Sequence, residues 1–181
     1  MKIQKMIVAM TLFFGMAGFA QKTVEVGGAP MYPTKNIIEN AVNSKDHTTL
    51  VAAVTAADLV ATLQSVGPFT VFAPTNAAFA QLPAGTLETL VKPENKKMLQ
   101  GILTYHVIAG KLDSKTIAKA IKVGDGKVIL TTLQGGNLTV TIGGNNLILT
   151  DEKGGKATVT IADVYQSNGL IHVVDTVLMH K

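Results

Sequence analysis

The apolar residues of this chain repeat with a helical period up to Gly124 and with a period of two residues beyond it. Before Gly124 they recur mainly three and four residues apart, which is typical of helices with one buried face. Residues 138–142 (LTVTI) and 158–161 (TVTI) instead alternate aliphatic side chains with threonine, which is typical of strands with one buried face. Helices followed by strands predict an α+β domain with an antiparallel sheet rather than alternating βαβ units.

Local signals indicate where these elements begin and end. Thr34 is expected to cap the first helix, and the spacing of Thr55 and Asp58 is that of a capping box at the start of another. Pro93 suits the first turn of a later helix, and Asp113 or Ser114 is expected to cap the last one. Strands are expected over residues 69–72, 128–133, 138–142, 147–150, 158–161, 170–174 and 177–179.

The N-terminus has the pattern of a secretory signal peptide over residues 1–20. Lys2 and Lys5 precede an apolar run over 7–19, and small residues at 18 and 20, positions −3 and −1, suit cleavage before Gln21. An uncleaved anchor is the alternative, although the run is short of the ~20 residues of a membrane span. We therefore expect a signal peptide at 1–20, a loose lead-in at 21–33 and one domain at 34–181. The mature protein would be secreted, extracellular or periplasmic, with no stable membrane span.

Composition excludes several kinds of chemistry. The chain has no cysteine, so disulfides, thiol catalysis and cysteine-ligated metals are ruled out. Its 16 basic residues are all lysine, which rules out bidentate guanidinium contacts to phosphate or guanine. Lys111, Lys115, Lys119 and Lys122 fall on one helical face, which favours a solvated face over a nucleic-acid or membrane patch. We expect no nucleic-acid partner.

No catalytic or metal-binding signature is present either. None of the four serines lies in a Gly-x-Ser-x-Gly motif. None of the four histidines has a histidine partner at the spacing of a local zinc site, although distant ones could converge in the fold. The sequence therefore predicts a protein that is not an enzyme and has no cofactor and no metal.

Three segments together resemble the fasciclin domain of periostin and the transforming-growth-factor-β-induced proteins, and of their single-domain secreted bacterial relatives. They are residues 67–79 (GPFTVFAPTNAAF), 105–108 (YHVI) and 168–178 (NGLIHVVDTVL), and the resemblance extends over residues 34–179. It implies N-terminal helices packed on an antiparallel wedge or sandwich. It also implies a secreted, non-enzymatic module for cell adhesion or matrix interaction. Relatives usually close with a proline where this chain has His180, a difference that bears on the exit of the last strand.

Most residues of the two long segments have a structural explanation. Aromatic side chains there would fill the core, Thr75 and Asn76 would satisfy backbone donors at a strand-to-helix turn, and Asn168-Gly169 would form a tight turn. We expect structural roles for Phe69, Phe72, Pro74, Thr75, Asn76, Phe79, Asn168, Gly169, His172 and Asp175.

The resemblance also implies partner-binding residues. A Tyr-His pair with aliphatic flanks is associated with integrin binding in animal relatives, and here it is Tyr105-His106. An Asp-Ile pair of those relatives corresponds to Asp163-Val164. The alternative for His106 is a buried, hydrogen-bonded histidine at a helix-to-strand junction. The expected partner is a protein or a cell-surface or matrix component.

A second function remains open at this point. The large aliphatic inventory also suits a soluble binding protein for a small apolar or carbohydrate ligand, held in a cleft between helices and sheet.

Overall fold

The computed structural model describes residues 23–181, so the expected signal peptide lies outside the described residues. The helices in chain order are α1 (Ile37–Ala41), η1 (Lys45–His47), α2 (Thr48–Ala56), α3 (Val60–Gln64), α4 (Asn76–Ala80), α5 (Thr86–Leu90), η2 (Pro93–Asn95), α6 (Lys96–Tyr105) and α7 (Ser114–Val123). The strands are β1 (Val24–Val26), β2 (Ala29–Met31), β3 (Phe69–Pro74), β4 (Val107–Ala109), β5 (Lys127–Thr131), β6 (Asn137–Gly143), β7 (Asn146–Thr150), β8 (Lys156–Gln166) and β9 (Gly169–Val174).

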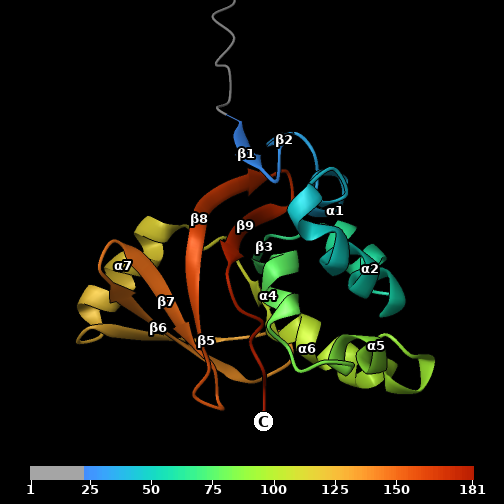
Figure 1. Cartoon of the computed structure of the whole chain (residues 1–181). Coiled ribbons are helices and arrows are strands. Elements are labelled where there is room, and N and C mark those ends of the chain that lie inside the picture. Colours follow the sequence, from blue (N-terminus) through green and yellow to red (C-terminus); the bar gives the residue numbers. More distant parts are fainter. Residues whose placement is uncertain (1–22) are drawn as a thin grey trace, which may run out of the picture.

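Seven strands form one sheet in the order β4-β3-β9-β8-β7-β6-β5 (Figure 1). Each neighbouring pair is antiparallel except β3 and β9, which run parallel from Phe69 beside Gly169 to Pro74 beside Val174. The sheet is therefore mixed: the α+β class expected from the sequence is confirmed, and the antiparallel arrangement expected for the sheet is wrong at this one pair. Parallel strands need a long crossover connection. Here residues 75–168 supply it, and both strands are buried almost throughout.

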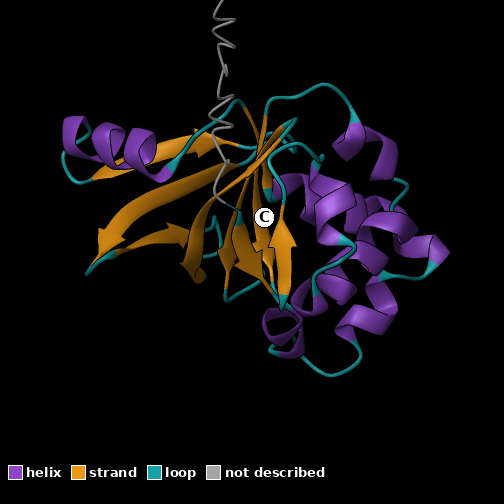
Figure 2. Ribbon diagram, turned by 90° about the horizontal axis from the view of Figure 1, so that it is seen from above, coloured by secondary structure: helices purple, strands orange, loops and turns teal. Residues whose placement is uncertain are grey.

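The helices cover the sheet unequally. Helices α1 to α6 gather on one side, whereas α7 lies apart at the opposite end, beside the consecutive antiparallel strands β5 to β8, which we call the meander (Figures 1 and 2). Because strand side chains alternate between faces, β3 contributes Val71 and Ala73 to a core under the helices and Phe72 to a second core. We call these the helix-side core and the sheet-side core; α7 closes the sheet-side core with Ile117 and Ile121.

The N-terminal lead-in differs from expectation. Residues 24–31 form the hairpin β1–β2, and Val26, Ala29 and Met31 are buried in the helix-side core. Gly27 and Gly28 both have positive φ, which allows the tight turn. The Gly27 carbonyl also accepts a hydrogen bond from the Lys45 amide at 3.1 Å. Residues 24–31 are thus packed against the domain rather than loose.

Two helix starts were also predicted at the wrong residues. The first helix is capped by Asn36, whose side chain accepts from the Glu39 amide in a capping box, and not by Thr34. Thr55 lies in the last turn of α2, where its hydroxyl donates to the Val51 carbonyl. Asp58 has positive φ and separates α2 from α3. The cap predicted at Asp113 is confirmed, since its side chain accepts from the Thr116 amide.

Residues 177–179, predicted as a strand, have no strand partner in the described chain. Val177 and Leu178 are nevertheless buried. The backbone amides of Leu178 and Met179 donate to the side chains of His106 and Asp151, which take the place of a neighbouring strand. We call residues 175–181 the C-terminal strap.

Candidate functional site

Tyr105 is the last residue of α6 and is fully buried in the sheet-side core. Its hydroxyl donates to the Asn137 carbonyl at 2.6 Å and accepts from the Glu152 amide at 3.2 Å. Burial raises the pKa of Tyr105 to about 12. The side chain therefore joins the end of α6 to the first residue of β6 and to the turn after β7.

His106 follows directly and is also buried. Its Nδ1 lies 2.8 Å from the Ile102 carbonyl, and its Nε2 accepts from the Leu178 amide at 3.0 Å. Because Nε2 is an acceptor, Nδ1 carries the hydrogen and donates it. Burial lowers the pKa of His106 to about 4, so the ring is neutral at pH 7.

The C-terminal strap lies next to this pair. The ring of His180 is 5.9 Å from the ring of Tyr105, and the Met179 amide donates to Asp151 Oδ2 at 2.9 Å. Tyr105-His106 is consequently covered on this side by residues of the strap. A partner can contact the pair only after local opening.

Asp163 and Val164 lie on β8, where the register against β9 is irregular. Val164 is buried in the helix-side core. Asp163 is half-buried with φ near 60°, and its carboxylate accepts from the amide and the hydroxyl of Ser114, at 2.7 and 2.5 Å. Asp163 thus attaches the start of α7 to the sheet.

The surroundings of Asp163 hold further polar side chains. The Tyr165 hydroxyl donates to Asp113 Oδ2 at 3.3 Å, and Lys111 Nζ lies 4.9 Å from the centre of the Tyr165 ring. Hydrogen bonds from Thr116 lower the pKa of Asp113. Of the four expected contact residues, Asp163 is the one with polar atoms near the surface.

His172 is fully buried on β9 and stacks on Phe72, with ring centres 5.4 Å apart. Its Nδ1 accepts from the Asp163 amide at 3.3 Å, and its Nε2 donates to the Leu112 carbonyl at 2.9 Å. Burial lowers the pKa of His172. The ring therefore links β9 to the segment that leads into α7.

Of the residues expected to have structural roles, Asn168 connects the most distant parts of the chain by hydrogen bonds. Its Nδ2 donates to the carbonyls of Leu63 at 2.7 Å and Ser65 at 3.0 Å, and its Oδ1 accepts from the Ile37 amide at 3.0 Å. This one side chain therefore joins α1, the end of α3 and the turn before β9. Gly169 beside it is irreplaceable, because a Cβ there would lie 2.1 Å from the Phe69 carbonyl oxygen.

The turn after β3 is held similarly. Thr75 caps α4 through the Ala78 amide at 3.2 Å. Asn76 Oδ1 accepts from the Thr49 amide at 2.9 Å, and its Nδ2 donates to the Lys45 carbonyl at 2.9 Å. Asp175 Oδ1 accepts from the Thr158 amide at 2.7 Å. Phe72 and Phe79 are buried, Phe69 packs against the helix-side core, and Pro74 ends β3.

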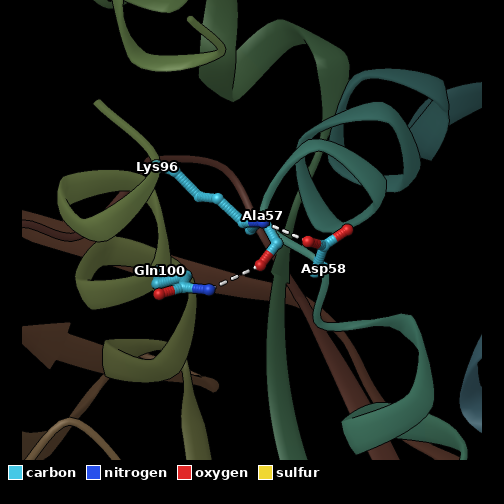
Figure 3. A network of polar contacts seen from close by, with 4 residues as sticks. All are labelled: Ala57, Asp58, Lys96 and Gln100. Carbon is cyan, nitrogen blue, oxygen red and sulfur yellow. Dashed lines mark hydrogen bonds and ion pairs between the residues drawn. The ribbon is translucent and has the colours of Figure 1, made fainter. Parts of the chain in front are cut away.

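The helix layer is tied together by polar contacts at the loop after α2. Figure 3 shows Lys96 and Gln100, one turn apart on α6, reaching this loop. Gln100 Nε2 donates to the Ala57 carbonyl at 2.7 Å, and Lys96 forms an ion pair with Asp58.

A narrow cavity of about 50 Å³ lies between the helices and the sheet. Its lining is almost entirely aliphatic and includes Val54, Leu103 and Ile171. The imidazole of His47 also reaches it; Ser44 Oγ lies 2.9 Å from Nδ1, and Nε2 has no hydrogen-bond partner among the described residues. This space is too small for a sugar ring, so it fits apolar groups of a few atoms rather than a carbohydrate.

Another feature, this one on the surface, lies between helix α7 and strand β5. It is an open groove, which we call the edge groove, lined by Thr116, Lys119, Ala120, Val123, Gly124, Lys127, Val128 and Ile129. Of the residues that line the groove, only Lys119 belongs to the lysine face expected from the sequence. The missed signal was the presence of Val123 and Ile129 at outward positions, where an amphipathic pattern has polar residues.

Within residues 23–181, no group of three or more His, Asp or Glu side chains is placed to hold a metal ion. His47, His106 and His172 do not converge on one such site. The same part of the chain contains no helix long and apolar enough to cross a membrane.

Comparison with known proteins adds the family context. A family profile described as Fasciclin domain matches residues 45–180. Protein sll1483 of Synechocystis is 44% identical over 99% of this chain and 98% of its own length. Immunogenic protein MPB70 of Mycobacterium bovis is 42% identical, over 77% of this chain and 66% of its own.

Two further similarities concern proteins longer than this chain. Cell surface glycolipoprotein MPB83 of Mycobacterium bovis is 37% identical over 91% of this chain and 63% of its own. The solved FAS1 domain pair of the insect cell adhesion molecule Fasciclin I superposes with a TM-score of 0.71 at 18% identity, over 80% of this chain and 51% of that one. The last similarity shows the fold alone.

Proposed function

This chain belongs to the fasciclin domain family, and from that premise we propose that it is a non-enzymatic interaction module that binds a protein or a matrix component at the cell surface or outside the cell. The observation that carries the proposal is the family match over residues 45–180. The name of one similar protein supports it, since that relative is a cell surface glycolipoprotein.

The proposal includes export by the signal peptide at 1–20 and a single functional unit at 34–181, to which the β1–β2 hairpin is attached. Its contact surface would include Asp163 and the polar residues around it. Tyr105, His106 and Val164 would contribute only once local opening exposes them, because each is buried in the closed structure.

Surface adhesion of a deletion strain beside its parent tests the role. We expect weaker adhesion of the deletion strain and recovery when the wild-type gene is returned. An Asp163→Asn variant, checked for folding by circular dichroism, tests the proposed surface, with Asp125→Asn as a matched exposed control. Full adhesion by the deletion strain would remove the proposal.

Export and cleavage of the signal peptide are tested separately. Mass spectrometry of the protein recovered from the envelope and the medium should give a mature N-terminus at Gln21. An intact N-terminus on a membrane-bound protein would favour the uncleaved anchor instead.

The cavity supports a second candidate, a binding protein for a small apolar ligand. A ligand that occupies the cavity raises the melting temperature, and the shift grows with the logarithm of the ligand concentration above its Kd. We would measure this shift for the wild type and for a Val71→Ile variant, in which an added methylene narrows the cavity. Equal shifts in both proteins, or none, would reject this candidate.

A further inference from the structure

Strand β5 is an edge of the seven-stranded sheet and pairs with β6 along one side only. The Thr132 amide donates to the Gly136 carbonyl, which fixes the direction of the neighbouring backbone groups. Since these groups alternate along a strand, those of Val128 and Leu130 point toward β6, and those of Ile129 and Thr131 point away. The edge ends at Leu133, whose amide donates to the Val107 carbonyl of β4 at 2.8 Å.

Helix α7 forms a wall beside this edge. It buries Ile117 and Ile121 in the sheet-side core, which leaves Thr116, Ala120 and Val123 on the side toward the edge groove. Val123 is 80% exposed and Ile129 is 59% exposed, values high for large aliphatic side chains on a helix and a strand. The groove has a volume of about 670 Å³. An edge strand facing a helix across an open groove is a known setting for an added strand.

The charge of this face is one-sided. Residues 115–127 carry four lysines and one acidic residue, Asp125. Lys119 and Lys127 lie on the groove itself, and no acidic side chain among residues 23–181 lines it. In the described part of the chain, the groove also has no aromatic residue on which a sugar or a base could stack. Its recognition elements are thus free backbone groups, aliphatic side chains and ammonium groups, which match an extended acidic peptide.

We propose that the edge groove binds a segment of a partner protein that adds to β5 as an extra strand, with aliphatic and acidic side chains in alternation. The carboxylates lie on the α7 side of the added strand, where they pair with Lys119, and the aliphatic side chains lie on the opposite face, where they pack on Ile129. A second copy of this chain is a poorer occupant, because pairing two β5 edges brings their lysines together. This inference goes beyond the proposed function and holds whatever the partner's origin.

The probe is a synthetic peptide of four glutamates alternating with three valines, blocked at both ends. Titrated into the 15N-labelled protein, it should shift the amide signals of Ile129 and Thr131 and slow their hydrogen exchange. A peptide with lysine in place of glutamate should bind about tenfold more weakly or not at all. N-methylation of alternate peptide residues should abolish binding, because the added strand then cannot pair.

Protein variants give the matched test. Ile129→Pro removes an outward amide that β6 does not use and should abolish binding; Ile129→Ala retains that amide and should weaken binding only by about tenfold. Lys119→Glu with Lys127→Glu should reverse the preference toward the lysine peptide. Circular dichroism checks the fold of each variant, and the N-methylated peptide decides the question if Ile129→Pro does not fold.

Three results would overturn the proposal. They are the absence of amide shifts at millimolar peptide, equal binding of the glutamate and lysine peptides, and binding that survives N-methylation. Sedimentation that shows a dimer of the free protein, lost in Ile129→Pro, would assign the edge to a second copy instead.

Discussion

His106 and His172 are buried in opposite hydrogen-bonding arrangements. His106 donates from Nδ1 and accepts at Nε2, whereas His172 accepts at Nδ1 and donates from Nε2. We therefore predict opposite neutral tautomers, which long-range 1H–15N NMR spectra distinguish directly. The same tautomer in both rings would contradict the contacts described above.

The buried histidines also predict a dependence of stability on pH. The pKa of His106 falls from 6.5 in the unfolded chain to about 4 in the fold, so the unfolded state binds more protons between these values. The stability is fully present above pH 6.5 and is lost as the pH falls toward 4, by about 3 kcal/mol for His106 alone. Burial lowers the pKa of His47 and His172 in the same direction.

Urea unfolding between pH 7.5 and 4.5 measures this loss. A His106→Gln variant should show a flatter profile, because one buried titrating group is gone. A variant profile as steep as that of the wild type would show that His106 does not carry the effect.

Asn168 predicts a large effect from a single polar side chain. Asn168→Ala should cost about 2–4 kcal/mol, since it leaves the Ile37 amide and two carbonyls without their partner. Asn168→Asp should be no milder, because a carboxylate then faces the carbonyls of Leu63 and Ser65. Asn145→Ala, in an exposed turn, is the control for denaturant unfolding and should change little.

At the residue scale, the sequence indicated local roles better than distant ones. The turn at Asn168-Gly169 and the cap at Thr75 could be predicted, because both depend on neighbouring backbone. The bonds of Asn168 to α1 and α3 could not, since they join residues more than 100 positions apart. For Tyr105-His106 the sequence left exposure and burial open, and contacts with Asn137 and Leu178 bury the pair.

Among the elements, strands of the meander were predicted because one face of each is buried and the alternation shows in the sequence. The parallel pairing of β3 and β9 left no such pattern, because strands buried on both faces read as continuous apolar runs. The end of α2 was missed for a different reason. Thr55 has the spacing of a cap, but its hydroxyl bonds back into its own helix.

The contacts of α6 in Figure 3 predict unequal effects of two neighbouring substitutions. Gln100→Ala should cost about 1 kcal/mol, because the Ala57 carbonyl loses its donor. Lys96→Ala should cost less than about 0.5 kcal/mol, because the ion pair with Asp58 is solvent-exposed. Chemical denaturation of both variants measures the difference, and a larger loss for Lys96→Ala would contradict it.

For the whole molecule, the class of fold and the helix-to-strand order followed from the change of period, and the family match agrees with the resemblance. The structure of the two ends of the domain could not be predicted from this change of period. The hairpin β1–β2 and the C-terminal strap are held by contacts with distant residues, such as Gly27 with Lys45 and Met179 with Asp151. Such contacts have no local pattern.

The strap predicts a change in the accessibility of Tyr105. Removal of residues 179–181 deletes the bond to Asp151 and the ring beside Tyr105. Nitration by tetranitromethane, located by mass spectrometry, should then increase at Tyr105. The exposed Tyr32 and Tyr165 serve as internal controls and should react equally in both proteins. An unchanged nitration rate at Tyr105 would show that the strap does not shield this side chain from the reagent.

The parallel pairing of β3 with β9 also sets the order in which parts of the sheet can form while the chain is synthesised. Strand β3 leaves the ribosome long before its central neighbour exists, because residues 75–168 are translated between them. Since β9 lies between β3 and β8, the pair β4-β3 and the strands β8-β7-β6-β5 can join into one sheet only once β9 is available.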